Sequence, residues 1–186
     1  MNSLGEKFQN IHAEIIERCL EGDRYAQNQL YKLYSKAMFN VSYRITNNFD
    51  DAEDALQEAF ISAFKNLTSY KGDAAFGAWL KRIVINKSIN LIKKRHSGLE
   101  EVSEDVGEES DDQEVKVDQL SVERIKRAIE KLPDGYRVVF SLYLLEGYDH
   151  GEIAEILGIT ESTSKSQFNR SKKKIKEILE KEVIYE

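Results

Sequence analysis

Apolar residues recur every three or four positions along most of this chain, which is the spacing of one face of an α-helix. In the first half this pattern predicts four helices. The first covers residues 10–20 and ends before Gly22, and Asp23 is placed to cap the second. The sequence TNNFD interrupts the second helix, and the third begins near Asp50. The fourth helix follows the loop NLTSYKGD, which ends at Asp73.

The second half also predicts four helices. Residues 122–132 carry an apolar face, and Pro133 suits the start of the next helix, where its missing N–H costs nothing. Residues 136–145 are apolar nearly all round, which predicts a buried central helix. A short helix over 150–157 ends at Gly158, and the last helix follows it. No segment alternates as a strand does, so we expect an all-α fold.

Charge is distributed unevenly along the chain. Its net charge is −6, but residues 97–118 alone hold ten acidic residues and one basic residue. This segment lacks aromatic residues and a helical apolar stripe, which predicts a flexible acidic linker. We therefore expect two small helical domains, over residues 1–96 and 119–186. The remaining residues carry a net positive charge, as a polyanion-binding surface requires.

Other features narrow the class of protein. The single cysteine, Cys19, fits a reducing compartment, and no apolar run approaches the length of a membrane helix. We expect a cytoplasmic protein without direct membrane insertion. The chain has no paired nucleophile and base, no phosphate-binding glycine loop and no metal-binding set among His12, His96 and His150. The expectation is a protein that is not an enzyme and needs no cofactor or metal.

The segment HGEIAEILGITESTSKSQFNRSKKK predicts a helix-turn-helix. Ile153, Ala154 and Leu157 would face inward, and Gly158 to Thr160 would form the turn. The outer side of the following helix is rich in hydrogen-bond donors, as in a helix that recognises base edges. A helical hairpin with a basic solvated face is the alternative. The donor-rich residues are Ser162, Lys165, Ser166, Asn169, Arg170 and Lys173.

Two long stretches resemble the sigma factors of bacterial RNA polymerase. LPDGYRVVFSLYLLEGYDHGEIAEILGITESTSKSQFNRSKKKIK resembles region 4, and DAEDALQEAFISAFKNLTSYKGDAAFGAWLKRIVINKSINLIKKR resembles region 2. Their order and the short linker between them are similar to the extracytoplasmic-function group. The resemblance implies a protein that binds core RNA polymerase and directs promoter-specific initiation. A conventional helix-turn-helix regulator and a sigma-like decoy that binds only protein are the alternatives.

The resemblance assigns the −35 promoter element to the last helix. Many relatives have valine and arginine where this chain has Ser164 and Gln167, so the bases recognised cannot be inferred from them. The positions that match family contacts to the −35 element are Thr163, Lys165, Ser166, Asn169 and Arg170.

The resemblance assigns recognition and opening of the −10 element to the fourth helix and the loop before it. A base that leaves the stack needs hydrogen-bonding groups for its edge, and the single strand needs a basic surface. We expect Trp79 to fill the core and Tyr70 to be the better placed aromatic for touching bases. The candidate residues for the −10 element are Tyr70, Lys71, Lys81, Arg82, Asn86 and Asn90.

The acidic third helix is the segment that, in the family, docks on the clamp helices of the polymerase β′ subunit. A solvated acidic first turn and a carboxylate metal site are the alternatives. Many relatives are bound and inhibited by an anti-sigma factor. The resemblance therefore implies that an anti-sigma factor is a candidate further partner of this chain. The candidate docking residues are Asp51, Glu53, Asp54, Gln57 and Glu58.

Overall fold

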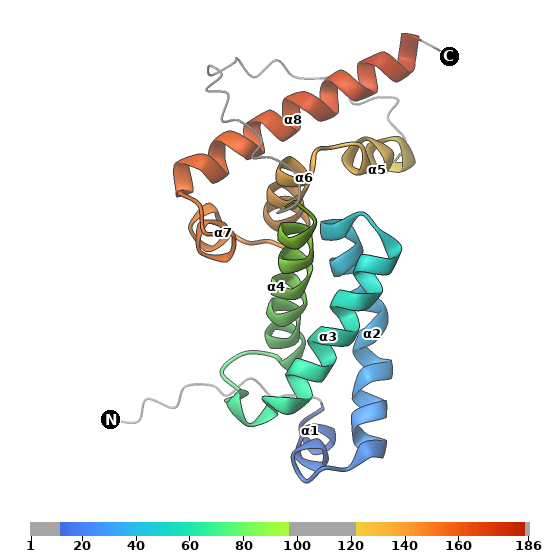
Figure 1. Cartoon of the computed structure of the whole chain (residues 1–186), viewed down its shortest axis with the longest axis vertical. Coiled ribbons are helices and arrows are strands. Elements are labelled where there is room, and N and C mark those ends of the chain that lie inside the picture. The colour runs from blue at the N-terminus through green and yellow to red at the C-terminus, as the bar shows by residue number, and fades with distance from the viewer. Residues whose placement is uncertain (1–11, 97–121, 185–186) are drawn as a thin grey trace. The chain divides into compact units, whose positions relative to one another are not determined.

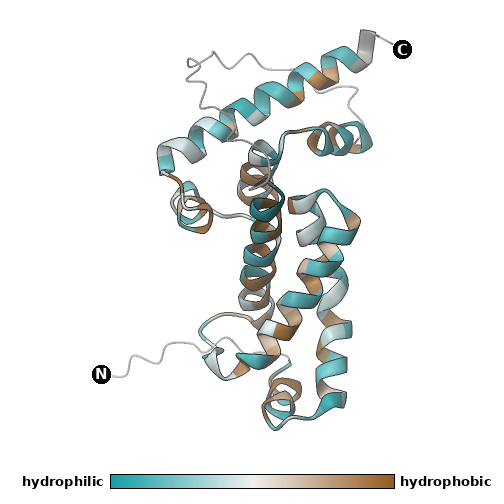
Figure 2. Ribbon diagram, in the orientation of Figure 1, coloured by the Kyte–Doolittle hydropathy of each residue, from teal (hydrophilic) through white to brown (hydrophobic). Residues whose placement is uncertain are grey.

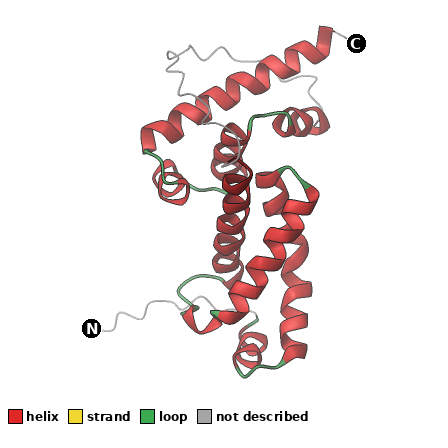
Figure 3. Ribbon diagram, in the orientation of Figure 1, coloured by secondary structure: helices red, strands yellow, loops and turns green. Residues whose placement is uncertain are grey.

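The computed structural model describes residues 12–96 and 122–184, and every regular element within them is a helix (Figures 1 and 3). The chain divides into two compact units, Met1–Ile92 and Lys93–Glu186. The division falls in the last turn of α4. The predicted linker, residues 97–118, lies outside the described residues. The all-α fold expected from the sequence is confirmed.

The described part of the first unit, from residue 12 onward, contains four α-helices, as the apolar pattern predicts. Asp23 caps the second of them by accepting hydrogen bonds from the backbone N–H groups of Tyr25 at 2.8 Å and Ala26 at 3.2 Å. Arg18 donates to the same carboxylate at 2.6 Å, which ties the end of the first helix to the start of the second. The elements are α1 (Ala13–Leu20), α2 (Arg24–Thr46), α3 (Phe49–Lys65), a short 3-10 helix η1 (Leu67–Ser69) and α4 (Phe76–His96).

The break between α2 and α3 is a tight turn formed by two asparagines. Asn47 has a φ of 51°, a left-handed conformation that asparagine tolerates better than most residues. Asn48 then caps α3 by accepting a hydrogen bond from the backbone N–H of Asp51 at 2.9 Å. This turn sends α3 back along α2, against which it packs.

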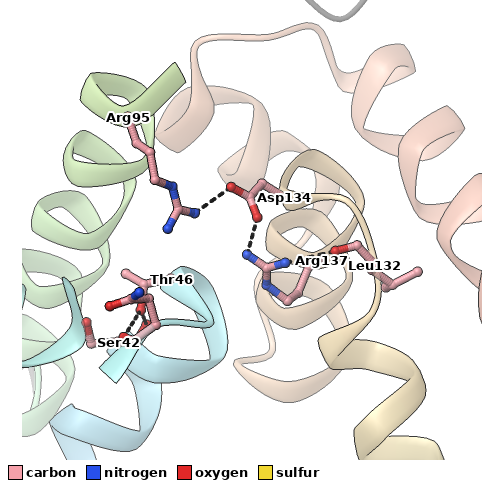
Figure 4. Close-up of polar contacts among 7 residues, drawn as sticks. Ser42, Thr46, Arg95, Leu132, Asp134 and Arg137 are labelled. Atoms are coloured by element: carbon pink, nitrogen blue, oxygen red, sulfur yellow. Dashed lines mark hydrogen bonds and ion pairs between the residues drawn. The ribbon is translucent and has the colours of Figure 1, made fainter. Parts of the chain in front are cut away.

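A small polar ladder lies inside the apolar core of the first unit. Ser42 on α2 and Ser88 on α4 are fully buried, and their hydroxyl oxygens are 2.8 Å apart. Thr46 donates to the backbone oxygen of Ser42 at 3.0 Å (Figure 4). Because these hydroxyls must be paired inside the core, they fix which side of α4 faces inward. Figure 2 shows the resulting interleaving of apolar and polar residues along α4.

Residues 122–184 of the second unit also form four α-helices, one of which continues as a π-helix. Arg137 is only 3% exposed, and its guanidinium pairs with Asp134 and donates to the backbone oxygen of Leu132 at 2.8 Å (Figure 4). The contact holds the loop before α6 against the helix itself. The elements are α5 (Val122–Glu130), α6 (Asp134–Phe140), the π-helix η2 (Ser141–Leu145), α7 (His150–Leu157) and α8 (Glu161–Ile184).

The prediction that residues 136–145 form a buried helix throughout is wrong for their last three positions. Burial ends at Leu142. The next three residues are exposed: Tyr143 by 38%, Leu144 by 57% and Leu145 by 45%. The cause is the π-helix, in which the N–H of Glu146 bonds to the carbonyl of Ser141 at 3.0 Å, five residues back. Although it is partly exposed, Tyr143 packs against the rings of His150 and Phe168, with centroids 4.4 and 4.5 Å away.

No helix in the two described stretches is both long and apolar enough to cross a membrane.

Candidate nucleic-acid interface

The helix-turn-helix is built as the sequence predicts. Asp149 and Glu152 form a capping box at the start of α7. The backbone N–H of Glu152 donates to the Asp149 carboxylate at 2.8 Å, and the backbone N–H of Asp149 donates to the Glu152 carboxylate at 2.9 Å. Gly158, with a φ of 73°, ends α7. Thr160 then accepts a hydrogen bond from the backbone N–H of Thr163 at 3.0 Å. Figure 1 shows α7 beside the first turns of α8, to which it packs.

The outer side of α8 carries the candidate −35 residues. Lys165, Ser166 and Asn169 are exposed, and Thr163 and Arg170 are half-buried. Lys165 forms an ion pair with Glu161, one turn earlier, at 2.6 Å. Donors on the first turns of such a helix are in the position from which helix-turn-helix proteins contact base edges. The carboxylate of Glu161 stands among them and lowers the positive potential there.

The inner side of α8 contains polar positions that the apolar pattern did not identify. Ser164 and Ser171 are fully buried. Ser164 lies 2.9 Å from Nδ1 of His150 on α7, and Ser171 donates to the backbone oxygen of Phe168 at 2.6 Å. Ser164 therefore belongs to the packing of α7 on α8. Gln167 is half-buried.

The candidate −10 residues of α4 form a stripe. Arg82, Asn86 and Asn90 are exposed and four residues apart, so they lie one above another on the same side of the helix. Lys81 is half-buried, and Lys71 is exposed in the preceding loop. The side of α4 that faces the core is buried through Leu80, Val84, Ile85, Ser88 and Ile89. The stripe presents two amides within a basic surface.

The loop before α4 is held by an aromatic cluster. Tyr70 donates through its hydroxyl to the backbone oxygen of Ala74 at 2.7 Å. Its ring packs against those of Phe76 and Trp79, with centroids 5.5 and 5.4 Å away. Phe76 is buried, whereas Trp79 is half-buried. Tyr70 and Trp79 thus form one aromatic surface that shapes the loop.

The candidate docking residues lie on the outer side of α3. Glu53, Asp54, Gln57 and Glu58 are exposed, and Asp51 is half-buried beside the cap of the helix. The other side of α3 is buried against the unit through Ala52, Ala55, Leu56 and Ala59. Within the described residues, no group of three His, Cys, Asp or Glu side chains is arranged to hold a metal ion. The acidic side is therefore an exposed surface and not a metal site, within the part of the chain that the structure describes.

Both halves of the chain match models of known protein families. Residues 30–97 match the family model for Sigma-70 region 2, and residues 122–175 match the model for Sigma-70, region 4. The chain is 30% identical to the ECF RNA polymerase sigma factor SigW of Bacillus subtilis over 176 residues, covering 88% of this chain and 94% of SigW. It belongs to the extracytoplasmic-function (ECF) RNA polymerase sigma factors.

Other relatives agree with this assignment. The sigma factor is 29% identical to SigM of Mycobacterium tuberculosis strain H37Rv, with 94% of this chain and 88% of SigM covered. It is 30% identical to the sigma-E factor of Escherichia coli K12, with 87% and 90% covered. Its fold is similar to that of the sigma factor RpoE of Bartonella quintana, with a TM-score of 0.56, 22% identity, and 82% and 96% covered.

As an ECF sigma factor, the protein binds core RNA polymerase and promoter DNA and directs promoter-specific transcription initiation. The match to region 2 decides against a conventional helix-turn-helix regulator, since such a regulator would account only for the C-terminal half. Sigma factors are initiation factors, and the polymerase carries the catalytic activity.

Proposed function

We propose that this sigma factor holds core polymerase through the outer side of α3 and contacts promoter DNA at two separate places. The stripe on α4 and the loop before it contact the −10 element and stabilise the opened strand. The outer side of α8 contacts the −35 element. In this scheme residues 1–96 and 119–186 are the two functional domains, and residues 97–118 link them.

The observation that carries the proposal is the exposure of Arg82, Asn86 and Asn90 as one polar stripe on a helix whose other side is the core of its unit. Structural stability does not require two amides in line among basic residues on a solvated surface. A base turned out of the stack does require such groups, because its hydrogen-bonding edge must be satisfied. The basic residues around the amides match the charge of the opened strand.

The docking assignment rests on the outer side of α3. Its acidic residues occupy the first turns of the helix, where the macrodipole favours negative charge, so the side also has a purely structural reason to be acidic. The family match supplies a functional reason for the acidic side, since the residues that match sigma region 2 include this helix. We propose the β′ clamp helices as the partner of this surface.

The test is transcription with purified components. The full chain is mixed with core polymerase and a library of random upstream sequences, and the start sites are mapped. We expect initiation from a restricted set of sequences that share two motifs, one near −35 and one near −10. Tight binding of the chain to duplex DNA without polymerase, and no initiation with it, would contradict the proposal.

We also propose an anti-sigma factor as a partner and the cytoplasm as the place of action. The solved relative from Bartonella quintana was crystallised with the anti-sigma factor NepR, which supports the first point. The need to reach RNA polymerase supports the second. The chain itself is proposed to have no catalytic activity. Purification of a tagged chain from its host, followed by identification of the proteins bound in equal amount, tests the anti-sigma partner.

A further inference from the structure

A hydrogen bond links the two helices of the helix-turn-helix across their interface. His150 is the first residue of α7, and its Nδ1 lies 2.9 Å from Oγ of Ser164 on α8. Ser164 has no exposed surface, so its hydroxyl cannot bond to bulk water instead. This contact spans the turn and joins residues that are fourteen positions apart.

The imidazole of His150 is held in place by two aromatic rings. Tyr143 of the π-helix stacks on it, with centroids 4.4 Å apart and planes 12° from parallel. Phe168 of α8 meets it edge-on at 5.8 Å and 62°. The backbone of His150 is fixed as well, because it lies inside the capping box of α7. The ring therefore presents Nδ1 to α8 in one orientation.

The hydrogen bond acts at the part of α8 that matters for DNA. Ser164 is the immediate neighbour of Thr163 and Lys165, two of the proposed −35 residues. Successive side chains on an α-helix are about 100° apart, so holding Ser164 inward turns its neighbours towards the outer side. Recognition of base edges tolerates errors of only about 0.5 Å and 10–20° in such side chains.

The polar contact adds an angular constraint to this geometry. A hydrogen bond weakens steeply when its angle departs from the optimum, so this contact favours one rotation of α8 on α7 in addition to the apolar packing. A buried hydroxyl that loses its partner is also unfavourable, which disfavours other positions of the helix. Ser171, further along α8, is equally buried but bonds within its own helix, so it gives no such control.

We propose that His150 is a positioning residue for −35 recognition, acting through its hydrogen bond to Ser164 to set the rotation of α8 on α7. This inference rests on the proposed role of α8 at the −35 element. His150 itself does not contact DNA in this scheme. Its loss alters where Thr163 and Lys165 lie.

The experiment measures how strongly transcription depends on the −35 element. Holoenzyme made from the full chain and core polymerase transcribes a promoter recovered from the library, and the same promoter with its −35 element scrambled. The ratio of the two rates is the readout. The variants are His150→Phe, which keeps a ring but removes the hydrogen bond, Ser164→Ala, and the two combined. Ser171→Ala is the matched control.

We expect His150→Phe and Ser164→Ala each to lower the ratio about fivefold, the size of effect that one hydrogen bond supports. The combined variant should lower it no further, because both changes remove the same contact. Ser171→Ala should leave the ratio unchanged. His150→Asn, whose amide can occupy the position of Nδ1, should recover most of the native ratio. Circular dichroism checks that each variant is folded.

Independent effects of His150→Phe and Ser164→Ala that multiply in the combined variant would overturn the inference. So would an equal loss of transcription from both promoters, which indicates a general loss of folded protein. If the native protein itself gives the same rate from both promoters, the proposed −35 role of α8 fails, and that result is distinct from failure of the His150 variants.

Discussion

Lys87 on α4 forms an ion pair with Glu58 on α3, with 3.2 Å between Nζ and Oε2. Glu58 belongs to the proposed docking surface, and Lys87 is one of the basic residues of the helix that we assign to the −10 element. The two side chains are 50% and 32% exposed, respectively, so either can be engaged by a partner. The pair connects the proposed polymerase-docking surface on α3 with the helix proposed to contact the −10 element.

Neutralising Glu58 tests which of these surfaces it serves. If it docks polymerase, Glu58→Gln should weaken binding to core polymerase about threefold, since exposed charges contribute modestly. Lys87→Met should leave that affinity within about twofold for the same reason. Fluorescence anisotropy of labelled chain with core polymerase measures both. Unchanged polymerase affinity in Glu58→Gln, together with reduced promoter opening, would show that Glu58 serves α4 instead.

Asn86 should be needed more for promoter opening than for polymerase binding. We expect Asn86→Ala to reduce open complex about tenfold, because a flipped base loses a hydrogen-bonding partner. Permanganate reactivity of unpaired thymines measures opening, and native gels measure holoenzyme formation. Asn40→Ala is the control, since Asn40 is an exposed amide on α2 outside the proposed surfaces. Loss of holoenzyme in Asn86→Ala would contradict the role assigned to it.

Removing the carboxylate next to Lys165 should strengthen binding to the −35 element. Glu161 is 56% exposed and pairs with Lys165, so Glu161→Gln removes a negative charge from the turn that we propose faces the −35 element. We expect holoenzyme affinity for promoter DNA to rise about threefold at low salt and less at high salt. Filter binding at several salt concentrations measures this. Glu180→Gln, far along the same helix, should have no effect; an equal gain from both variants would indicate a non-specific charge effect.

The unit that contains α1 and α2 should lose stability in acid through Asp23. The hydrogen bond from Arg18, together with those from backbone N–H groups, lowers the pKa of this carboxyl below its ordinary value. A carboxyl with a lowered pKa stabilises the folded state fully above its unfolded value of about 3.9, and this contribution is lost as pH falls through the folded value. Asp23→Asn should therefore be less stable than the native chain at pH 7, by a margin that narrows below about pH 4.

The measurement uses the single tryptophan of the chain, Trp79, whose fluorescence reports unfolding of the first unit. Urea midpoints are compared at pH 7, 5 and 3. Glu21→Gln, an exposed neighbouring carboxylate, is the control. A margin between Asp23→Asn and the native chain that stays constant down to pH 3 would show that Asp23 gains nothing from its charge.

Arg137 should stabilise the second unit alone. Arg137→Met removes one of the two arginines that pair with Asp134, and Arg95 still pairs with it at 2.6 Å, so we expect a loss of about 2 kcal/mol, the size of a hydrogen bond to a charged group. The far-UV circular dichroism transition should move to lower urea for part of the signal, while Trp79 fluorescence should be unchanged. Lys126→Met on the exposed side of α5 is the control. A shift in the Trp79 transition would mean that the two units unfold together.

Much of the fold is predictable from the sequence because its helices carry local signals. The apolar spacing identifies each helix, Asp23 and Gly158 mark a start and an end, and the structure places both as predicted. The buried hydroxyls of Ser164 and Ser88 were missed for a physical reason. A serine can be buried only where a partner meets it, and the partners, His150 and Ser42, come from other helices.

The candidate sites are only partly determined by sequence. The family resemblance, and not the apolar pattern, selects Arg82, Asn86 and Asn90, and their four-residue steps put them on one exposed side of α4. Reasoning from helical spacing failed at Tyr143 to Leu145, where it assumed an unbroken α-helix. One extra residue in the helical turn shifts which side of the helix each later side chain faces. The amino-acid composition of the segment does not indicate that extra residue. Which residues contact a partner remains a prediction from the family resemblance.

The π-helix has a consequence for how this segment tolerates changes in length. Because η2 contains one residue more than an α-helical turn, deletion of a single residue between 141 and 145 would let the hydrogen bonds return to the ordinary spacing. Every position downstream would then be turned by roughly 100° relative to α6. An amino-acid replacement here alters one side chain, whereas a one-residue deletion changes the orientation of the whole helix-turn-helix relative to α6. The number of residues in η2 is thus under stronger constraint than their identity.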